Sequence, residues 1–200
     1  MTKSVLFLCA AALLSCGTAL DVLAQADTPQ DQPMSITIPM PQGSVPEGIA
    51  IKDGIAFVSS VSQGSVYRID VESGEPEVLK EGSGQSSLGL LIDEQDRLFV
   101  AGGRGGTVEV LDAKSGKVLA SYKVADAEET FINDVDRLGD AIYATDSFAP
   151  VIYKLPLGEG GDLPEEEDIE RIALSGVTYD EGFNANGITQ TPDESALLIV

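Results

Sequence analysis

The sequence predicts an all-β fold built from repeated four-stranded antiparallel units. A fifteen-residue phrase, two strand-like runs around a tight polar turn, recurs without gaps at 56–70, 98–112 and 142–156. Turn signals such as Asp53-Gly54 separate short runs rich in β-branched and aromatic residues. After the N-terminal segment no stretch has a sustained helical period. Self-similarity at a fixed period decides the architecture before any single residue is interpreted.

Each complete unit supplies four expected strands in order along the chain. In the first unit they cover 46–51, 56–60, 66–71 and 77–80, and the second unit repeats this order from Leu88. The third unit starts at Asn133, carries a longer acidic loop over 158–168, and closes with a strand at 169–174. A fourth unit starts at Asn186 and reaches its second strand at Val200. The alternating run over 34–41 predicts one further short strand.

The spacing of the units predicts a β-propeller. Their first strands start 41, 45 and 53 residues apart, at Glu47, Leu88, Asn133 and Asn186. Four antiparallel strands at a period of roughly 40 to 50 residues are typical of a propeller blade. A β-sandwich fits less well, because sandwich strands do not form self-similar quartets. We therefore expect about three and a half blades over 46–200, as part of a larger ring, since propellers have roughly four to eight blades.

The composition is globular and strongly acidic. Hydrophobic residues make up 43% and charged residues 22%, and 12 Lys and Arg against 33 Asp and Glu give a net charge of -21. This charge argues against nucleic acid or an anionic membrane as a partner. The absence of His from these 200 residues excludes a Ser-His-Asp centre, a Cys-His centre or an imidazole zinc site within them.

The N-terminal segment, 1–26, is expected to be a secretory signal peptide. Lys3 precedes an apolar run over 5–14 that is too short to span a bilayer, and Ala24-Gln25-Ala26 forms an A-x-A cleavage site. Cleavage after Ala26 makes the protein secreted or periplasmic, with a polar lead-in over 27–45. The alternative is a bacterial lipoprotein lipidated at Cys16, which the cleaner A-x-A site disfavours.

Cysteine use limits the metals that the mature chain can bind. Cys9 and Cys16 both lie in the expected signal peptide. The mature chain then has neither a disulfide nor a thiol ligand. A metal would be held through oxygen, which selects hard cations such as Ca²⁺, Mg²⁺ or Mn²⁺.

Equivalent positions at the first strands predict a cation site. In a propeller these strands line the central channel, so their starts converge on one mouth of it. Three of the four positions carry an oxygen-bearing side chain, Glu47, Asn133 and Asn186, and Leu88 is the exception. One carboxylate and two amides form a plausible partial shell for Ca²⁺. Considered singly, each of these residues is most simply a turn former. Turn formation does not explain, however, why Glu47 lies at the same repeat position as Asn133 and Asn186.

Other polar residues near these positions can be interpreted as binding residues or as turn formers. Asp134 and Asn184 are candidate substrate contacts and equally ordinary turn formers. Asp146 shares its repeat position with Ser60 and Gly102, so we expect it to cap the turn that follows it. The glycine-rich stretch 102–106 lies between two strands with no helix after it, which predicts a tight turn rather than a phosphate-binding loop.

Three motifs together resemble a known family. PEGIAI around Glu47, FINDV around Asn133 and NANGITQTPDESALLIV around Asn186 are similar to the family of senescence marker protein, gluconolactonase and luciferin-regenerating enzyme. Its members are six-bladed propellers with a divalent metal in the channel. The resemblance covers roughly 46–200 and implies that Glu47 and Asn186 bind the metal and that Asn133 lies beside it. The family's remaining ligand, an Asp that is also its acid/base group, would fall beyond Val200, so the catalytic residue is unknown.

The resemblance implies a metal-dependent hydrolase of sugar-type lactones or related esters. It implies a small-molecule substrate and a divalent cation, Ca²⁺ first, with Mg²⁺, Mn²⁺ or Zn²⁺ as alternatives. Each motif alone also occurs in propellers that are not enzymes. The second hypothesis is therefore a non-catalytic secreted propeller that binds a ligand or a protein partner.

Overall fold

The computed structural model describes residues 37–200, and the expected signal peptide with its cleavage site and both cysteines lies outside them. The described part consists of strands β1 to β14 and two short 3-10 segments. None of its helical segments is long and apolar enough to cross a membrane. The all-β prediction is confirmed.

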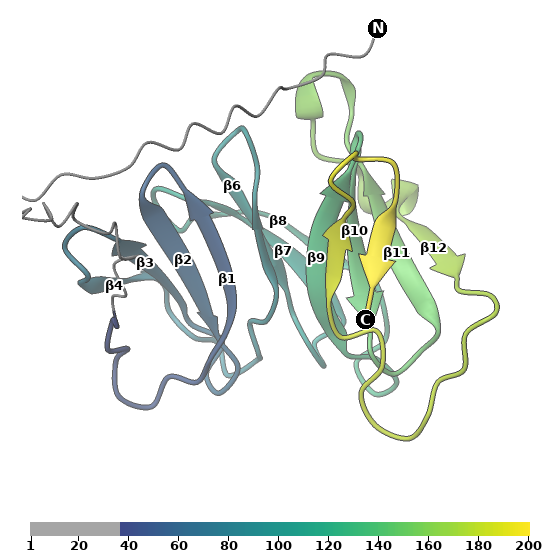
Figure 1. Ribbon diagram of the computed structural model, residues 1–200, viewed down its shortest axis with the longest axis horizontal. Helices are drawn as coiled ribbons and strands as arrows, with labels where there is room; N and C mark the ends of the chain where they lie inside the picture. Colours follow the sequence, from purple (N-terminus) through teal and green to yellow (C-terminus); the bar gives the residue numbers. More distant parts are fainter. Residues whose placement is uncertain (1–36) are drawn as a thin grey trace, which may run out of the picture. The chain divides into compact units, whose positions relative to one another are not determined.

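Three sheets of four antiparallel strands follow one another along the chain (Figure 1). The first sheet contains β1 (Pro46–Lys52), β2 (Ile55–Ser60), β3 (Val66–Asp70) and β4 (Pro76–Lys80). The second contains β5 (Leu90–Ile92), β6 (Arg97–Ala101), β7 (Thr107–Asp112) and β8 (Val118–Lys123). The third contains β9 (Ile132–Leu138), β10 (Ala141–Asp146), β11 (Val151–Pro156) and β12 (Glu170–Ala173).

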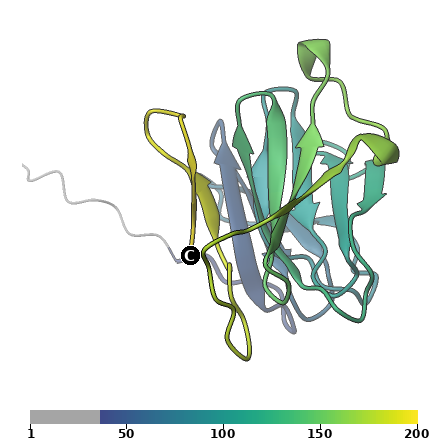
Figure 2. The ribbon, with the colours of Figure 1, turned by 90° about the vertical axis from the view of Figure 1, so that its right-hand side faces the viewer.

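The last described element is a two-stranded hairpin of β13 (Ile188–Gln190) and β14 (Leu197–Ile199). The acidic loop of the third sheet contains the two 3-10 segments, Glu159–Gly161 and Glu166–Asp168. Figure 2 shows this loop as the light-green segment that projects beyond the strands. The order of strands within each sheet follows the chain, which is the blade pattern that the repeats predict.

The sheets pack face to face through apolar side chains. Strand β6 shows how: Leu98 and Val100 belong to the cluster shared with the first sheet, whereas Phe99 and Ala101 belong to the cluster shared with the third. Successive side chains of a strand point to opposite faces of its sheet. A strand between two other sheets therefore buries both faces, which explains why 98–101 is uninterruptedly apolar.

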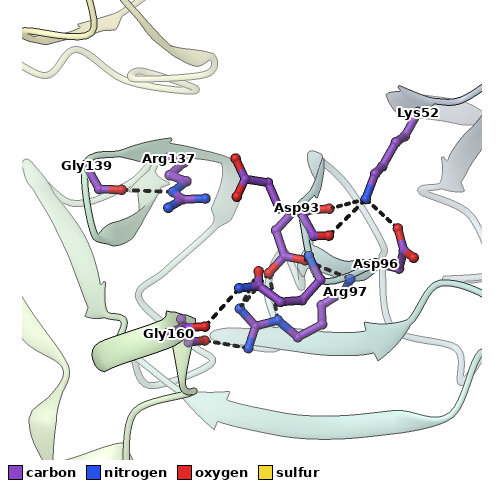
Figure 3. A network of polar contacts seen from close by, with 10 residues as sticks. Lys52, Asp93, Asp96, Arg97, Arg137, Gly139 and Gly160 are labelled. Atoms are coloured by element: carbon purple, nitrogen blue, oxygen red, sulfur yellow. Dashed lines mark hydrogen bonds and ion pairs between the residues drawn. The ribbon is translucent and has the colours of Figure 1, made fainter.

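A polar network ties the three sheets together at the end opposite the starts of the first strands (Figure 3). The Nζ of Lys52 donates to the carbonyl oxygens of Asp93 and Glu94 at 2.9 and 3.2 Å. Asp93 is buried and forms an ion pair of 2.6 Å with Arg97. Arg97 Nη1 donates to the carbonyl oxygen of Gly161 at 2.7 Å, so side chains of the second sheet connect the first and the third.

The described part of the lead-in does not form the strand that the sequence predicts over 34–41. The described residues of the strand expected over 34–41 form no strand, and the first three residues of that range lie outside the described part. No described strand pairs with them. Ile38 and Met40 instead pack against Ala56, Val58 and Ile69 on the face of the first sheet that points away from the second. The alternating apolar pattern thus marks side chains that cover a sheet face without entering a sheet.

Candidate functional site

The first strands of consecutive sheets lie side by side. Strand β1 contacts β5, β5 contacts β9, and β9 contacts β13. A cavity of about 200 Å³ opens where these strands begin. Its polar side chains belong to Glu47, Asp134 and Asn186. The structure thus brings together side chains that are 139 residues apart in the sequence, at the place where the repeat comparison expects a site.

The starts of β1 and β9 share one local geometry. In each strand a β-bulge sets two residues opposite one residue of the next strand. The second residue of each bulge donates its amide to a hydroxyl: Gly48 N to Ser59 Oγ at 2.8 Å, and Asp134 N to Thr145 Oγ1 at 3.1 Å. Glu47 and Asn133 therefore occupy equivalent positions, as predicted, and Asp134 is the equivalent of Gly48.

Asp134 occupies the second position of the bulge in β9. The repeat comparison did not place it among the metal ligands. The other sheets and the hairpin have glycine there, namely Gly48, Gly89 and Gly187. A Cβ atom on Gly89 would lie 2.0 Å from Asp134 Oδ1, and one on Gly187 would lie 3.8 Å from Oδ2. Glycines on both sides leave the space that the carboxylate of Asp134 fills. Aligning the residues after the three oxygen-bearing positions would have revealed this signal.

Hydrogen bonds fix the Asp134 carboxylate across the gap between β9 and β13. Its Oδ2 accepts the amide of Ile188 at 3.0 Å, and its Oδ1 accepts the amide of Val135 at 2.9 Å. Two residues along β9, Asp136 Oδ2 accepts the amide of Gln190 at 2.8 Å. Carboxylates here take the place of backbone carbonyls in joining the hairpin to the third sheet. Asp134 consequently has a structural role beside any binding role.

The pKa values of both carboxyl groups in the cavity are raised. Desolvation by burial raises the pKa of Glu47, and the nearby carboxylate of Asp134 raises it further. Desolvation also raises the pKa of Asp134, an effect that the amides of Ile188 and Val135 oppose. A cation between these groups would relieve both effects.

Asn133 occupies the expected repeat position but is not part of the cavity lining. It is buried, and its Nδ2 donates to Ser147 Oγ at 2.8 Å. Leu88, at the same position of the second sheet, is also buried, whereas Glu47 and Asn186 are exposed to the cavity. The second and third sheets have described neighbours on both sides, which explains the burial of Leu88 and Asn133.

Asn184 lies in the loop before β13 and shapes that loop. Its Oδ1 accepts the amide of Asp180 at 3.0 Å, and its Nδ2 donates to the carbonyl oxygens of Asp180 and Gly182 at 3.0 and 3.2 Å. Its backbone amide donates to the carbonyl oxygen of Ser147 at 3.1 Å. These are the contacts of a turn former, and Asn184 is not among the residues lining the cavity.

Asp146 caps its turn, as expected from its repeat position. It is buried, and its Oδ1 accepts the amides of Phe148 at 2.9 Å and Ala149 at 3.2 Å. Its Oδ2 accepts a hydrogen bond from the hydroxyl of Thr130 at 2.6 Å. A carboxylate so fully engaged by its surroundings has little capacity left for a ligand.

The donor set of the cavity suits a hard divalent cation. Within residues 37–200 no three His, Cys, Asp or Glu side chains are grouped so that they could hold a metal on their own. Glu47 and Asp134 with the amide of Asn186 give two carboxylates and one neutral oxygen donor, all on separate strands or strand starts. Oxygen donors of this kind are those that Ca²⁺ and Mg²⁺ take, with water completing the shell.

Comparison with known proteins supports the architecture. No protein-family profile and no curated protein sequence matches the chain. Among solved structures, a catalytically inactive virginiamycin B lyase from Staphylococcus aureus with quinupristin superposes with a TM-score of 0.61 at 16% identity. The superposition covers 79% of this chain and 49% of the lyase.

Two further solved structures are similar to this chain in fold at low sequence identity. A streptogramin B lyase has a TM-score of 0.60 at 17% identity over 78% of this chain and 48% of its own. A nidogen/laminin complex has a TM-score of 0.55 at 20% identity over 78% of this chain and 57% of its own. The chain thus spans about half the length of the lyases that it resembles. At these identities the similarity concerns the fold alone, and the chain has the fold of a β-propeller.

Proposed function

We propose that the protein is a secreted or periplasmic, cation-dependent hydrolase of sugar-type lactones or related esters. In this proposal it belongs to the family of senescence marker protein, gluconolactonase and luciferin-regenerating enzyme. One observation carries the proposal: Glu47, Asp134 and Asn186 meet around a single cavity at the starts of neighbouring first strands. The motifs that contain these residues are those on which the family resemblance rests.

The residues of the cavity fit a divalent cation. Glu47 and Asn186 would bind it directly, and Asp134 would complete the side next to β9, where glycines leave room for its carboxylate. Burial raises the pKa of both Glu47 and Asp134, and the carboxylate of Asp134 raises that of Glu47 further, so a bound cation would favour the charged form of each. Ca²⁺ is the first candidate, with Mg²⁺, Mn²⁺ or Zn²⁺ as alternatives. When bound, such an ion supplies Lewis-acid polarisation of a carbonyl oxygen.

The chain's own residues then have distinct roles. The amide of Ile188 holds Oδ2 of Asp134, which fixes the direction in which this carboxylate faces the cavity. Asn133, which donates to Ser147, and Asn184, whose amide donates to the carbonyl oxygen of Ser147, lie outside the cavity lining and support the loops beside it. No residue of this chain is assigned as the acid/base group, because the family pattern expects an Asp beyond Val200 in that role.

The test is lactone hydrolysis by the full-length protein. We expect hydrolysis of a sugar lactone to stop after exhaustive chelation and to return on adding Ca²⁺ or another divalent cation. Glu47→Gln should lower kcat/KM at least about tenfold, since ligand and near-ligand substitutions commonly cost that much. The matched control is Glu77→Gln on β4, an exposed carboxylate outside the cavity, which should leave kcat/KM unchanged. Hydrolysis that survives chelation would contradict the mechanism.

The alternative is a non-catalytic propeller that binds a ligand or a protein partner. Propellers similar to this chain occur both in lyases and in a nidogen/laminin complex, so the fold serves enzymes and binding proteins alike. Cation binding without turnover of any lactone or ester by the full-length protein would favour this second function.

A further inference from the structure

Three phenylalanine side chains and one arginine form a cluster outside the cavity, which we call the aromatic platform: Arg104, Phe131, Phe148 and Phe183. Each lies in a connection at the end of the sheets where the first strands begin: between β6 and β7, before β9, between β10 and β11, and before β13. Phe131 is three residues before Asp134, so the platform lies roughly 10 Å from the cavity along β9.

The rings contact one another at angles typical of aromatic pairs. Phe183 meets Phe131 edge to face, with ring centroids 4.9 Å apart and an interplanar angle of 84°. Phe148 lies 5.5 Å from Phe131 and 5.2 Å from Phe183, tilted against both. Phe183 nevertheless keeps 60% of its surface exposed, and Phe131 and Phe148 are only half-buried. The cluster is therefore an open apolar surface and not a closed core.

Hydrogen bonds to groups beneath the platform hold its backbone. The buried carboxylate of Asp146 accepts the backbone amides of both Phe131 and Phe148, at 3.1 and 2.9 Å. The carbonyl oxygen of Ser147 accepts the amide of Asn184, which fixes the residue next to Phe183. The backbone thus presents the exposed ring of Phe183 beside two half-buried rings, and contiguous apolar patches often mark binding sites.

Arg104 adds a free cation at the edge of the rings. Its guanidinium carbon lies 4.8 Å from the ring centroid of Phe148. Within 37–200 it forms no ion pair and donates no side-chain hydrogen bond, so its N–H groups face solvent in a chain with a net charge of -21. Paired hydrogen bonds between Gly103 and Ile132 set its loop beside Phe131. Gly103 has a φ of +55°, so the turn itself requires glycine there.

We propose that the aromatic platform binds a carboxylate ligand with a planar or apolar body. The carboxylate pairs with the guanidinium of Arg104, for which bidentate geometry is available, and the body lies against Phe131 and Phe183. At about 0.15 M salt, charges beyond about 8 Å are screened, so the net charge of the chain does not by itself prevent an anion from pairing with Arg104. The site is independent of the cation cavity and of the proposed hydrolysis.

The experiment is calorimetric titration of the full chain with 2-naphthoate and with neutral 2-naphthylmethanol, in the presence of a chelator at about 0.15 M salt. We expect saturable binding of 2-naphthoate that is about tenfold tighter than that of the alcohol, the size expected for a hydrogen-bonded charge. Arg104→Ala should abolish this preference. Arg68→Ala, which removes the same charge from β3, should preserve it. Phe183→Ala should weaken both ligands.

Three outcomes would overturn the proposal. The first is the absence of saturable 2-naphthoate binding. The second is an unchanged preference for the acid in Arg104→Ala. The third is binding that appears only when the chelator is replaced by Ca²⁺, because that result would assign the carboxylate to the cation cavity instead of Arg104.

Discussion

Asp134 stands at a position where the neighbouring first strands have glycine, and its surroundings explain what the sequence could predict of the site. The repeat register correctly placed Glu47 and Asn133 at equivalent positions, since both are the first residue of a β-bulge. It did not indicate that Asn133 is buried against Ser147 while Asp134 lines the cavity. Side-chain direction at a bulge depends on local backbone geometry, which strand alternation does not describe.

The close packing of Asp134 against Gly89 can be tested by adding a methyl group at Gly89. A methyl group at this position would lie 2.0 Å from Oδ1 of Asp134 and 2.6 Å from its Cα. We expect Gly89→Ala to lower the free energy of unfolding by about 1 to 3 kcal/mol, the range for overpacked sites. Denaturant titration measures it. Gly158→Ala, whose methyl group would meet only Asp162, should stay within about 0.5 kcal/mol of wild type. Equal stabilities would show that Asp134 does not lie against Gly89.

The raised pKa of Glu47 gives the second test. A carboxyl group with a raised pKa in the folded state contributes stability at low pH, which is lost as the pH rises through that pKa. In chelator, Glu47→Gln should therefore become more stable relative to wild type as the pH increases from acid to neutral. Thermal unfolding across this range measures the difference. A difference that stays constant with pH would show that Glu47 is not perturbed by burial and by Asp134.

At the scale of the elements, the strands were predictable because apolar alternation and tight turns specify them locally. The four strands expected in the first unit lie within one residue of β1 to β4 at every boundary. The lead-in was not predictable, because Ile38 and Met40 pack on a sheet face without a strand partner. The connections between sheets were not predictable either, since Lys52 meets Asp93 and Arg97 meets Gly161 only after the sheets have packed (Figure 3).

The side chain of Asp93 positions Arg97, which in turn contacts the third sheet. Its Oδ1 accepts the amides of Gln95 and Arg97 at 3.0 and 2.8 Å, and its Oδ2 accepts Nε of Arg97 at 2.7 Å. Asp93→Ala removes the buried acceptor and leaves the partly buried Arg97 without its partner, so we expect a loss of about 3 kcal/mol in the free energy of unfolding. Asp193→Ala, in an exposed turn, should cost less than about 1 kcal/mol. Equal losses would show that the buried pair adds nothing beyond an ordinary turn bond.

At the scale of the whole chain, acidity sets how the protein responds to its medium. A net charge of -21 makes the chain self-repelling at neutral pH. In chelator, raising NaCl from about 0.01 to 0.3 M should therefore raise the melting temperature by several degrees through screening. Differential scanning calorimetry checks this. A melting temperature that does not change would show that the carboxylates are compensated within the fold.

Cation binding is the central claim, and isothermal titration of chelator-treated full-length protein with Ca²⁺ at constant ionic strength tests it directly. We expect one saturable site in wild type, weakened at least about tenfold by Glu47→Gln and unaffected by Glu77→Gln. Mg²⁺ and Mn²⁺ in parallel titrations identify the preferred ion. Heats that do not saturate, or equal affinities in the two variants, would mean that Glu47, Asp134 and Asn186 meet around a cavity that holds no cation.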